Sequence, residues 1–148
     1  TRKNPLTGTK KSSQATEAAS MKIEHAALYV RDLEAARHFF ETYFAAKSNA
    51  LYHNQRTGFQ SYFLTFDEGA RLEIMTRDED LTDGSHDLLF TGYHHLAFSL
   101  GSPEAVDQLT VRLEKGGYPV LSGPRVTGDG YYESCIQAFE GNQIELTV

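Results

Sequence analysis

The sequence holds a single cysteine, Cys135, among its 148 residues. One cysteine cannot form an intrachain disulfide framework or a zinc site built on several thiolates, so we expect a reducing, cytoplasmic setting. Cys135 itself is interpreted as a small buried apolar group rather than a reactive thiol. No apolar run approaches the roughly 18–20 residues that span a bilayer. We therefore expect no membrane span, and we expect no secretory signal.

Basic residues are scarce after the first twenty positions. The chain carries 14 Lys and Arg and 20 Asp and Glu, and four of the basic but only one of the acidic residues lie in 1–20. Residues 21–148 thus hold 10 basic and 19 acidic side chains, a net charge of −9, which argues against a nucleic-acid or anionic-membrane partner. Residues 1–20 have no periodic apolar pattern, and we expect them to be a disordered arm or a cloning remnant before a start at Met21.

The remaining residues repeat one order of elements, which gives the expected fold class. A strand, a helix and three strands are expected between 21 and 76, and the same order recurs between 92 and 148. The expected ranges are 22–30, 32–46, 49–55, 59–66 and 70–76, then 93–100, 102–116, 118–121, 131–139 and 143–148. A polar stretch at 77–85 joins them. The pattern predicts an α+β fold, a single domain over 21–148 in which two tandem βαβββ modules (21–76 and 92–148) pack side by side.

Short matching phrases align the two halves. Residues 25–30 (HAALYV) correspond to 95–100 (HLAFSL), and 72–74 (LEI) correspond to 144–146 (IEL). Each half therefore opens on a histidine and closes on a glutamate. Because strand side chains alternate between faces, these four residues lie opposite the large aliphatic side chains, on the face that no helix covers. The four are His25, Glu73, His95 and Glu145.

Two imidazoles and two carboxylates on one face predict a site for one divalent cation, whose charge would balance the two carboxylates. A plainer explanation applies to each pair alone, because polar residues alternate with apolar ones on any half-exposed strand. The observation that favours the metal hypothesis is that two His/Glu pairs occupy matching positions in the two halves of the repeat. His38 and His53 are interpreted as surface or packing residues, and His94 as facing the helix side with Leu96. His86 lies in the linker, and the less favoured alternative is that it borders the site. Arg125 and 131–133 are interpreted as a turn, with a place at the mouth of the site as the alternative.

The chain also resembles a known family. The matching stretches are 25–32 (HAALYVRD), 93–98 (YHHLAF), 123–134 (GPRVTGDGYYES) and especially 140–146 (EGNQIEL). They are similar to the vicinal oxygen chelate superfamily, the glyoxalase/bleomycin resistance/dioxygenase fold, and to its small glyoxalase I-like members. The resemblance covers 21–148 and implies a cup of paired βαβββ modules around one divalent metal (Zn, Ni, Co, Mn or Fe), often in dimers that complete the site.

The resemblance implies an activity as well. A first glutamate ligand is typical of the glyoxalase I-like and epimerase-like branch, so Glu73 points to isomerisation. We expect a lyase or isomerase acting on a small thiol adduct of an α-ketoaldehyde, or a related α-hydroxycarbonyl, through a metal-bound enediolate. Glu145 is the expected catalytic base and Glu73 the second candidate. The alternatives are a non-catalytic binding or resistance protein and a metal-dependent thiol transferase or dioxygenase. We also expect a homodimer, since a sheet pair this small leaves strand edges exposed.

Overall fold

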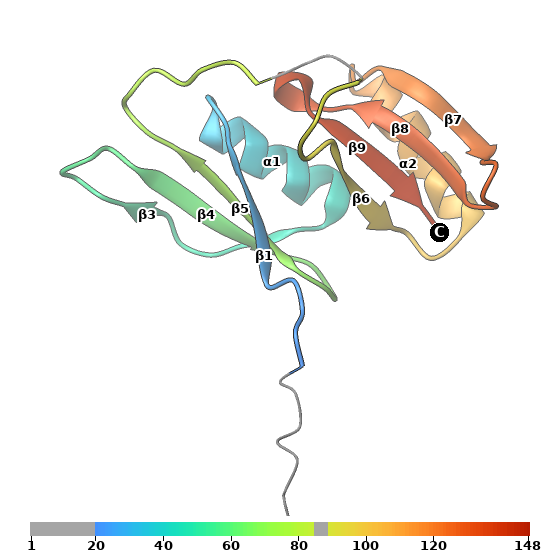
Figure 1. Ribbon diagram of the computed structural model, residues 1–148, viewed down its shortest axis with the longest axis horizontal. Helices are drawn as coiled ribbons and strands as arrows, with labels where there is room; N and C mark the ends of the chain where they lie inside the picture. Colours follow the sequence, from blue (N-terminus) through green and yellow to red (C-terminus); the bar gives the residue numbers. More distant parts are fainter. Residues whose placement is uncertain (1–19, 85–88) are drawn as a thin grey trace, which may run out of the picture.

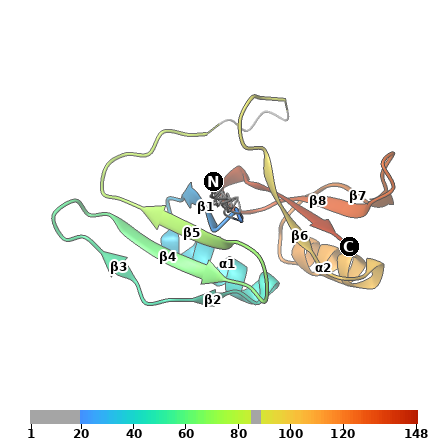
Figure 2. The ribbon, with the colours of Figure 1, turned by 60° about the horizontal axis from the view of Figure 1, so that its bottom comes forward.

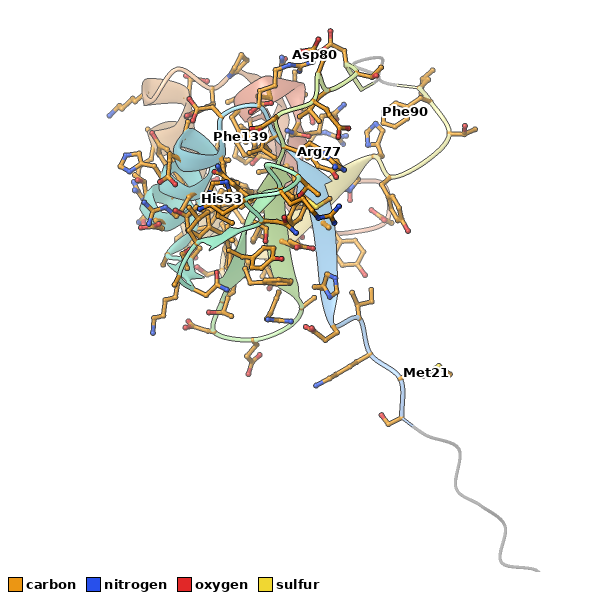
Figure 3. All side chains as sticks on the ribbon, turned by 90° about the vertical axis from the view of Figure 1, so that its left-hand side faces the viewer. Met21, His53, Arg77, Asp80, Phe90 and Phe139 are labelled. Carbon is orange, nitrogen blue, oxygen red and sulfur yellow. The ribbon has the colours of Figure 1, made fainter. Side chains whose placement is uncertain are left out.

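Two mixed β-sheets, each with one helix, form the body of the molecule in the computed structural model, which describes residues 20–84 and 89–148 (Figure 1). The arm expected at 1–20 lies outside the described residues apart from Ser20, and so does His86. Met21 is 94% exposed, on a segment that leads away from the body of the molecule (Figure 3). In the two described ranges, neither helix is long and apolar enough to cross a membrane.

The first module follows the expected order. Its sheet runs β1-β5-β4-β2, with β3 also paired to β4, and β1 is parallel to β5 whereas the other pairs are antiparallel. The elements are β1 His25–Tyr29, α1 Leu33–Phe44, β2 Lys47–Ser48, β3 Tyr52–His53, β4 Gln60–Thr65 and β5 Arg71–Thr76.

The second module repeats this arrangement. Its sheet runs β6-β9-β8-β7, and again the first strand is parallel to the last while the other pairs are antiparallel. The elements are β6 His95–Ser99, α2 Pro103–Lys115, β7 Val120–Val126, β8 Tyr132–Gln137, the short 3-10 helix η1 Phe139–Gly141 and β9 Gln143–Thr147. The predicted α+β fold of two βαβββ modules is confirmed.

Three local details differ from the sequence prediction. The strand expected at 49–55 is interrupted: β2 and β3 lie on either side of 49–51, and Asn49 between them still exchanges hydrogen bonds with Phe63 of β4. The strand expected to end at 121 continues to Val126, so Arg125 lies in β7 and not in a turn. Gly123 permits this, because its φ is +77° and a Cβ there would lie 2.4 Å from the Glu133 carbonyl oxygen. The third difference is η1, which the sequence analysis did not predict.

Capping residues define both helices. The Asp32 side chain accepts a hydrogen bond from the Ala35 N–H at the start of α1, and Ser102 does the same for Ala105 at the start of α2. Pro103 occupies the first turn of α2, and Gly117 follows its end with φ +96°. The expected helix ends therefore agree with the structure to within about two residues.

Helix α1 packs against both modules. Phe40, 1% exposed, lies 6.3 Å from the Phe98 ring and 5.5 Å from the Phe139 ring of the second module. Phe44 approaches Phe98 more closely, at 4.3 Å between ring centroids. The buried residues of the two modules form one continuous hydrophobic cluster. In Figure 1, α1 accordingly lies behind the gap between β1 and β6, the inner edge strands of the two sheets.

A polar contact also joins the modules. The Glu140 carboxylate, in η1, accepts hydrogen bonds from the backbone N–H groups of Arg31 (2.7 Å) and Asp32 (3.3 Å), at the start of α1. The Arg31 side chain in turn donates to the Leu81 carbonyl and pairs with Asp83 in the segment between the modules. These contacts link the start of α1 in the first module to η1 of the second module and to the segment between the modules.

Replacing Phe40 with alanine removes an aromatic ring that both modules contact. We expect Phe40→Ala to lower the free energy of unfolding by about 3–5 kcal/mol, because the lost burial is compounded by a cavity. Val111→Ala on the exposed side of α2 is the matched control and should change it by less than about 0.5 kcal/mol. Urea unfolding followed by circular dichroism measures both, and equal effects would contradict the shared core.

Candidate functional site

The strand register places each histidine and its glutamate on one face. Glu73 is directly opposite Ala27 in the parallel β1–β5 pair, and Glu145 is opposite Ala97 in the β6–β9 pair. Side chains two residues apart on a strand share a face, so His25 lies on the face of Glu73 and His95 on the face of Glu145. We call this surface, on the side opposite the helices, the open face. The alanines leave room above the strands.

The open face of the second module brings two of the four residues into contact. His95 Nε2 lies 3.3 Å from Glu145 Oε2, and the Glu145 side chain is 23% exposed. The carboxyl group of Glu133, on β8, lies close to that of Glu145. Burial, with the neighbouring Glu145 carboxylate, raises the pKa of Glu133. This half-site is therefore rich in carboxylate oxygens beside one imidazole.

The open face of the first module is built differently. His25 Nδ1 lies 3.5 Å from Glu24 Oε1, and the imidazole ring meets the Phe63 ring edge-on, with 5.5 Å between centroids. Arg71 donates to Glu24 from two guanidinium nitrogens and stacks over Phe63 at 4.2 Å. Its hydrogen bonds hold the pKa of Glu24 at about 2. The hydrogen bond to Glu24 raises the pKa of the Arg71 guanidinium, and the charge of the nearby Glu73 adds to this effect.

A cavity separates the two half-sites. It has a volume of about 590 Å³, lies between β1 and β6, and has His25, His94 and His95 on its wall beside largely apolar residues from both modules. Figure 2 shows β1 and β6 as neighbouring strands at the inner edges of their sheets. The apolar part of the wall consists of Ile23, Ala26, Ala27, Leu28, Phe40, Leu72, Leu96, Phe139 and Ile144.

The structure does not gather all four predicted ligands into one cluster. Over 20–84 and 89–148, no three side chains of His, Cys, Asp or Glu lie close enough to hold a metal ion. The donor set nevertheless fits one in chemical terms, because imidazole nitrogen and carboxylate oxygen are ligands of borderline divalent cations. Within one chain, the His95–Glu145 half-site lies on one side of the cavity, and the strands that carry His25 and Glu73 lie on the other side.

Three neighbours of these residues were missed by sequence reasoning. Glu133 begins the expected strand 131–139 but was interpreted as a turn residue and not as part of the site, although it shares the alternation of Cys135 on β8. Glu24 and His94 each precede one of the two histidines, a correspondence that the repeat alignment contained. His94 had been assigned to the helix-facing side, yet its Nδ1 lies 2.9 Å from His95 Nδ1.

The two other histidines in the described ranges, His38 and His53, lie apart from the site. His38 contacts Thr42 on α1 and His53 is exposed on β3.

Cys135 is expected to react slowly with alkylating reagents. Burial and the neighbouring carboxylates of Glu145 and Glu133 raise the pKa of its thiol, so less of the reactive thiolate forms at pH 8. Iodoacetamide labelling followed by mass spectrometry should be at least about 10-fold slower in the folded protein than in guanidinium chloride. Labelling equally fast in both states would contradict the assignment of Cys135 as an unreactive thiol.

Comparison with known proteins agrees with this fold. Residues 22–146 match the Glyoxalase/Bleomycin resistance protein/Dioxygenase superfamily. The uncharacterized protein YqjT of Bacillus subtilis is 32% identical over 127 residues, which cover 84% of this chain and 96% of that protein. The structure of a possible glyoxalase from Bacillus cereus is 26% identical, covers 87% of this chain and 100% of that chain, and gives a TM-score of 0.64.

More distant structures share the fold alone. A glyoxalase family protein from Bacillus cereus is 18% identical, with 90% and 97% of the two chains covered and a TM-score of 0.72. The trypanothione-dependent glyoxalase I of Leishmania major is 20% identical, with 86% of each chain covered and a TM-score of 0.68. On the sequence match over nearly its whole described length, the chain belongs to the Glyoxalase/Bleomycin resistance protein/Dioxygenase superfamily.

Proposed function

We propose that this protein is a metal-dependent lyase or isomerase of glyoxalase I type, acting on a small thiol adduct of an α-ketoaldehyde or a related α-hydroxycarbonyl. The observation that carries the proposal is the His95–Glu145 contact on the open face, together with its repeat in the register of His25 and Glu73. An imidazole and a carboxylate from each module would supply two nitrogen and two oxygen donors.

The proposed cofactor is one divalent cation (Zn, Ni, Co, Mn or Fe) held by His25, Glu73, His95 and Glu145. When bound, the cation would polarise two adjacent substrate oxygens and so acidify the neighbouring C–H bond. The two carboxylates would balance its charge and thereby offset their own desolvation. If the ion is zinc, ligand distances of ~2.0–2.2 Å are expected.

Glu145 is proposed to move the proton. Its carboxylate would take the proton from one substrate carbon and return it to the adjacent carbon, which isomerises the adduct without any net oxidation or reduction. Glu145, in the middle of β9, contacts His95 directly and its side chain remains 23% exposed, so the carboxylate could reach a substrate on the open face. Glu73, in the middle of the β1–β5 pair beside Arg71, is proposed to act mainly as a ligand.

The apolar cavity between β1 and β6 favours a small organic molecule as the substrate. Its volume of about 590 Å³ falls in the range of ordinary ligand pockets, and the two proposed histidine ligands line it. The carbon skeleton of the substrate would lie against the apolar wall while its oxygens face the imidazoles.

A homodimer is proposed to complete the site. β1 and β6 are edge strands in the described part of the chain, and exposed strand edges are commonly covered by pairing or by a second subunit. The four ligands do not meet within one described chain, so a second copy bringing its own module alongside could unite them.

The direct test combines metal analysis with an activity assay. We expect the purified protein to bind one divalent ion per four-ligand site, and to convert methylglyoxal in the presence of a thiol into the hydroxyacyl thioester, followed by ultraviolet absorbance. Bound metal without turnover would favour the binding or resistance alternative. Turnover that transfers the thiol or consumes oxygen would favour the transferase or dioxygenase alternative.

The two glutamates should differ when each is replaced. Both Glu73→Gln and Glu145→Gln should weaken metal affinity, because each removes a charge from the site. Only Glu145→Gln should keep a turnover deficit of about 10²–10⁴-fold when metal is in excess, since it also removes the base. Turnover measured against metal concentration separates the two. A deficit confined to Glu73→Gln would reverse the assignment.

Complementation tests whether two chains build the site. His25→Ala and His95→Ala should each be inactive alone. If each site joins modules from two subunits, co-expression should restore on the order of a quarter of the wild-type sites, because mixed dimers hold one intact site out of two. No restored activity, together with monomers in sedimentation at micromolar concentration, would contradict the shared site.

A further inference from the structure

The His25 ring has two nitrogens, and which of them carries the proton decides which can bind a ligand. A neutral imidazole has one N–H donor and one nitrogen with a lone pair. A nitrogen that binds a metal must have its proton removed, and the hydrogen bond made by the other nitrogen sets the tautomer. The surroundings of His25 Nδ1 are therefore informative about His25 Nε2.

Glu24 faces His25 Nδ1. The distance from Nδ1 to Glu24 Oε1 is 3.5 Å, an ion-pair distance somewhat longer than the roughly 2.7–3.2 Å of an ordinary N–H···O hydrogen bond. An ionised carboxylate can only accept hydrogen bonds, so a proton shared between the two groups is one that the imidazole donates from Nδ1. With the proton on Nδ1, Nε2 is the nitrogen with the lone pair.

Glu24 is itself fixed. Arg71 donates from Nε to Glu24 Oε2 at 2.8 Å and from Nη2 to Oε1, a two-point contact that sets the plane of the carboxylate. The Arg71 guanidinium lies over Phe63, whose ring also meets the edge of the His25 imidazole. These four side chains thus contact one another on the open face, where those of His25, Glu24 and Arg71 remain 40–53% exposed.

The second module uses the same position in the sequence. His94, which aligns with Glu24 at the offset of 70 residues, contacts His95 at Nδ1 (2.9 Å) while His95 Nε2 faces Glu145. In both modules, therefore, the residue before the histidine approaches Nδ1. The contact with Nδ1 recurs although the contacting group is a carboxylate in one module and an imidazole in the other. A residue that orients the neighbouring histidine is expected at this position in both modules.

We propose that Glu24, held by Arg71, is a positioning residue that keeps the His25 proton on Nδ1 and so presents the Nε2 lone pair to a metal ion. The proposal rests on the proposed function in taking His25 as a ligand. An ordinary surface ion pair between Arg71 and Glu24 would leave the tautomer of His25 as it is in water, where the proton on Nε2 is favoured.

The test is the tautomer of His25 in the metal-free, full-length protein, read from two-bond ¹H–¹⁵N correlations at a pH where the ring is neutral. His25→Ala assigns the resonances. We expect the Nδ1–H form in the wild type, a shift to the Nε2–H form in Glu24→Ala, and retention of the Nδ1–H form in Glu24→Gln, whose amide oxygen can still accept. Glu41→Ala, which removes another exposed glutamate paired with an arginine, is the control and should change nothing.

Zinc affinity provides a second measurement, by competition with a chromophoric chelator. Glu24→Ala should weaken binding about 10–100-fold, as expected when the outer partner of a histidine ligand is lost. An Nε2–H form in the wild type, an unchanged tautomer in Glu24→Ala, or unchanged zinc affinity would overturn the proposal. If the wild type binds no zinc, the proposed function fails, and the tautomer still decides whether Glu24 positions His25.

Discussion

Parallel pairing of the first and last strand of each module is the constraint on which the site depends. In β1–β5 and β6–β9, a histidine strand lies beside a glutamate strand, and the register sets Glu73 and Glu145 opposite alanines. A shift of one residue in either pair would turn the glutamate toward the helix and the aliphatic residues toward solvent. Core packing therefore fixes the register, because Leu72, Ile74, Ile144 and Leu146 must remain buried.

Equivalent positions in the two half-sites are occupied by residues of different chemical types. In the first module Glu24 and Arg71 surround the histidine, whereas in the second His94 and Glu133 accompany His95 and Glu145. In the first half-site, the positive charge of the Arg71 guanidinium balances the carboxylate charge. In the second, two carboxylates lie close together, which is unfavourable unless a cation or a proton is shared between them. This asymmetry supports the proposed division of roles, in which the first half supplies ligands and the second supplies both ligands and the base.

Much of this arrangement could be predicted from the sequence. The repeat predicted the order of elements, and alternation placed His25, Glu73, His95 and Glu145 on the open face, because burial on a helix-covered sheet requires a period of two. What could not be predicted depends on contacts between distant segments. The continuation of β7 through Gly123 depends on the close approach of β8, and the contact of His94 with His95 depends on how the chain enters β6. The separation of the half-sites across a cavity depends on module packing, which no local pattern encodes.

The central claim is that imidazoles and carboxylates from both modules bind one cation. X-ray absorption spectroscopy of the zinc-loaded protein tests it most directly, because the first coordination shell reports ligand type and number. The account predicts two imidazole nitrogens and two carboxylate oxygens at ~2.0–2.2 Å, with one imidazole lost in His25→Ala and one in His95→Ala. A shell that keeps both imidazoles in either variant, or that contains none in the wild type, would contradict it.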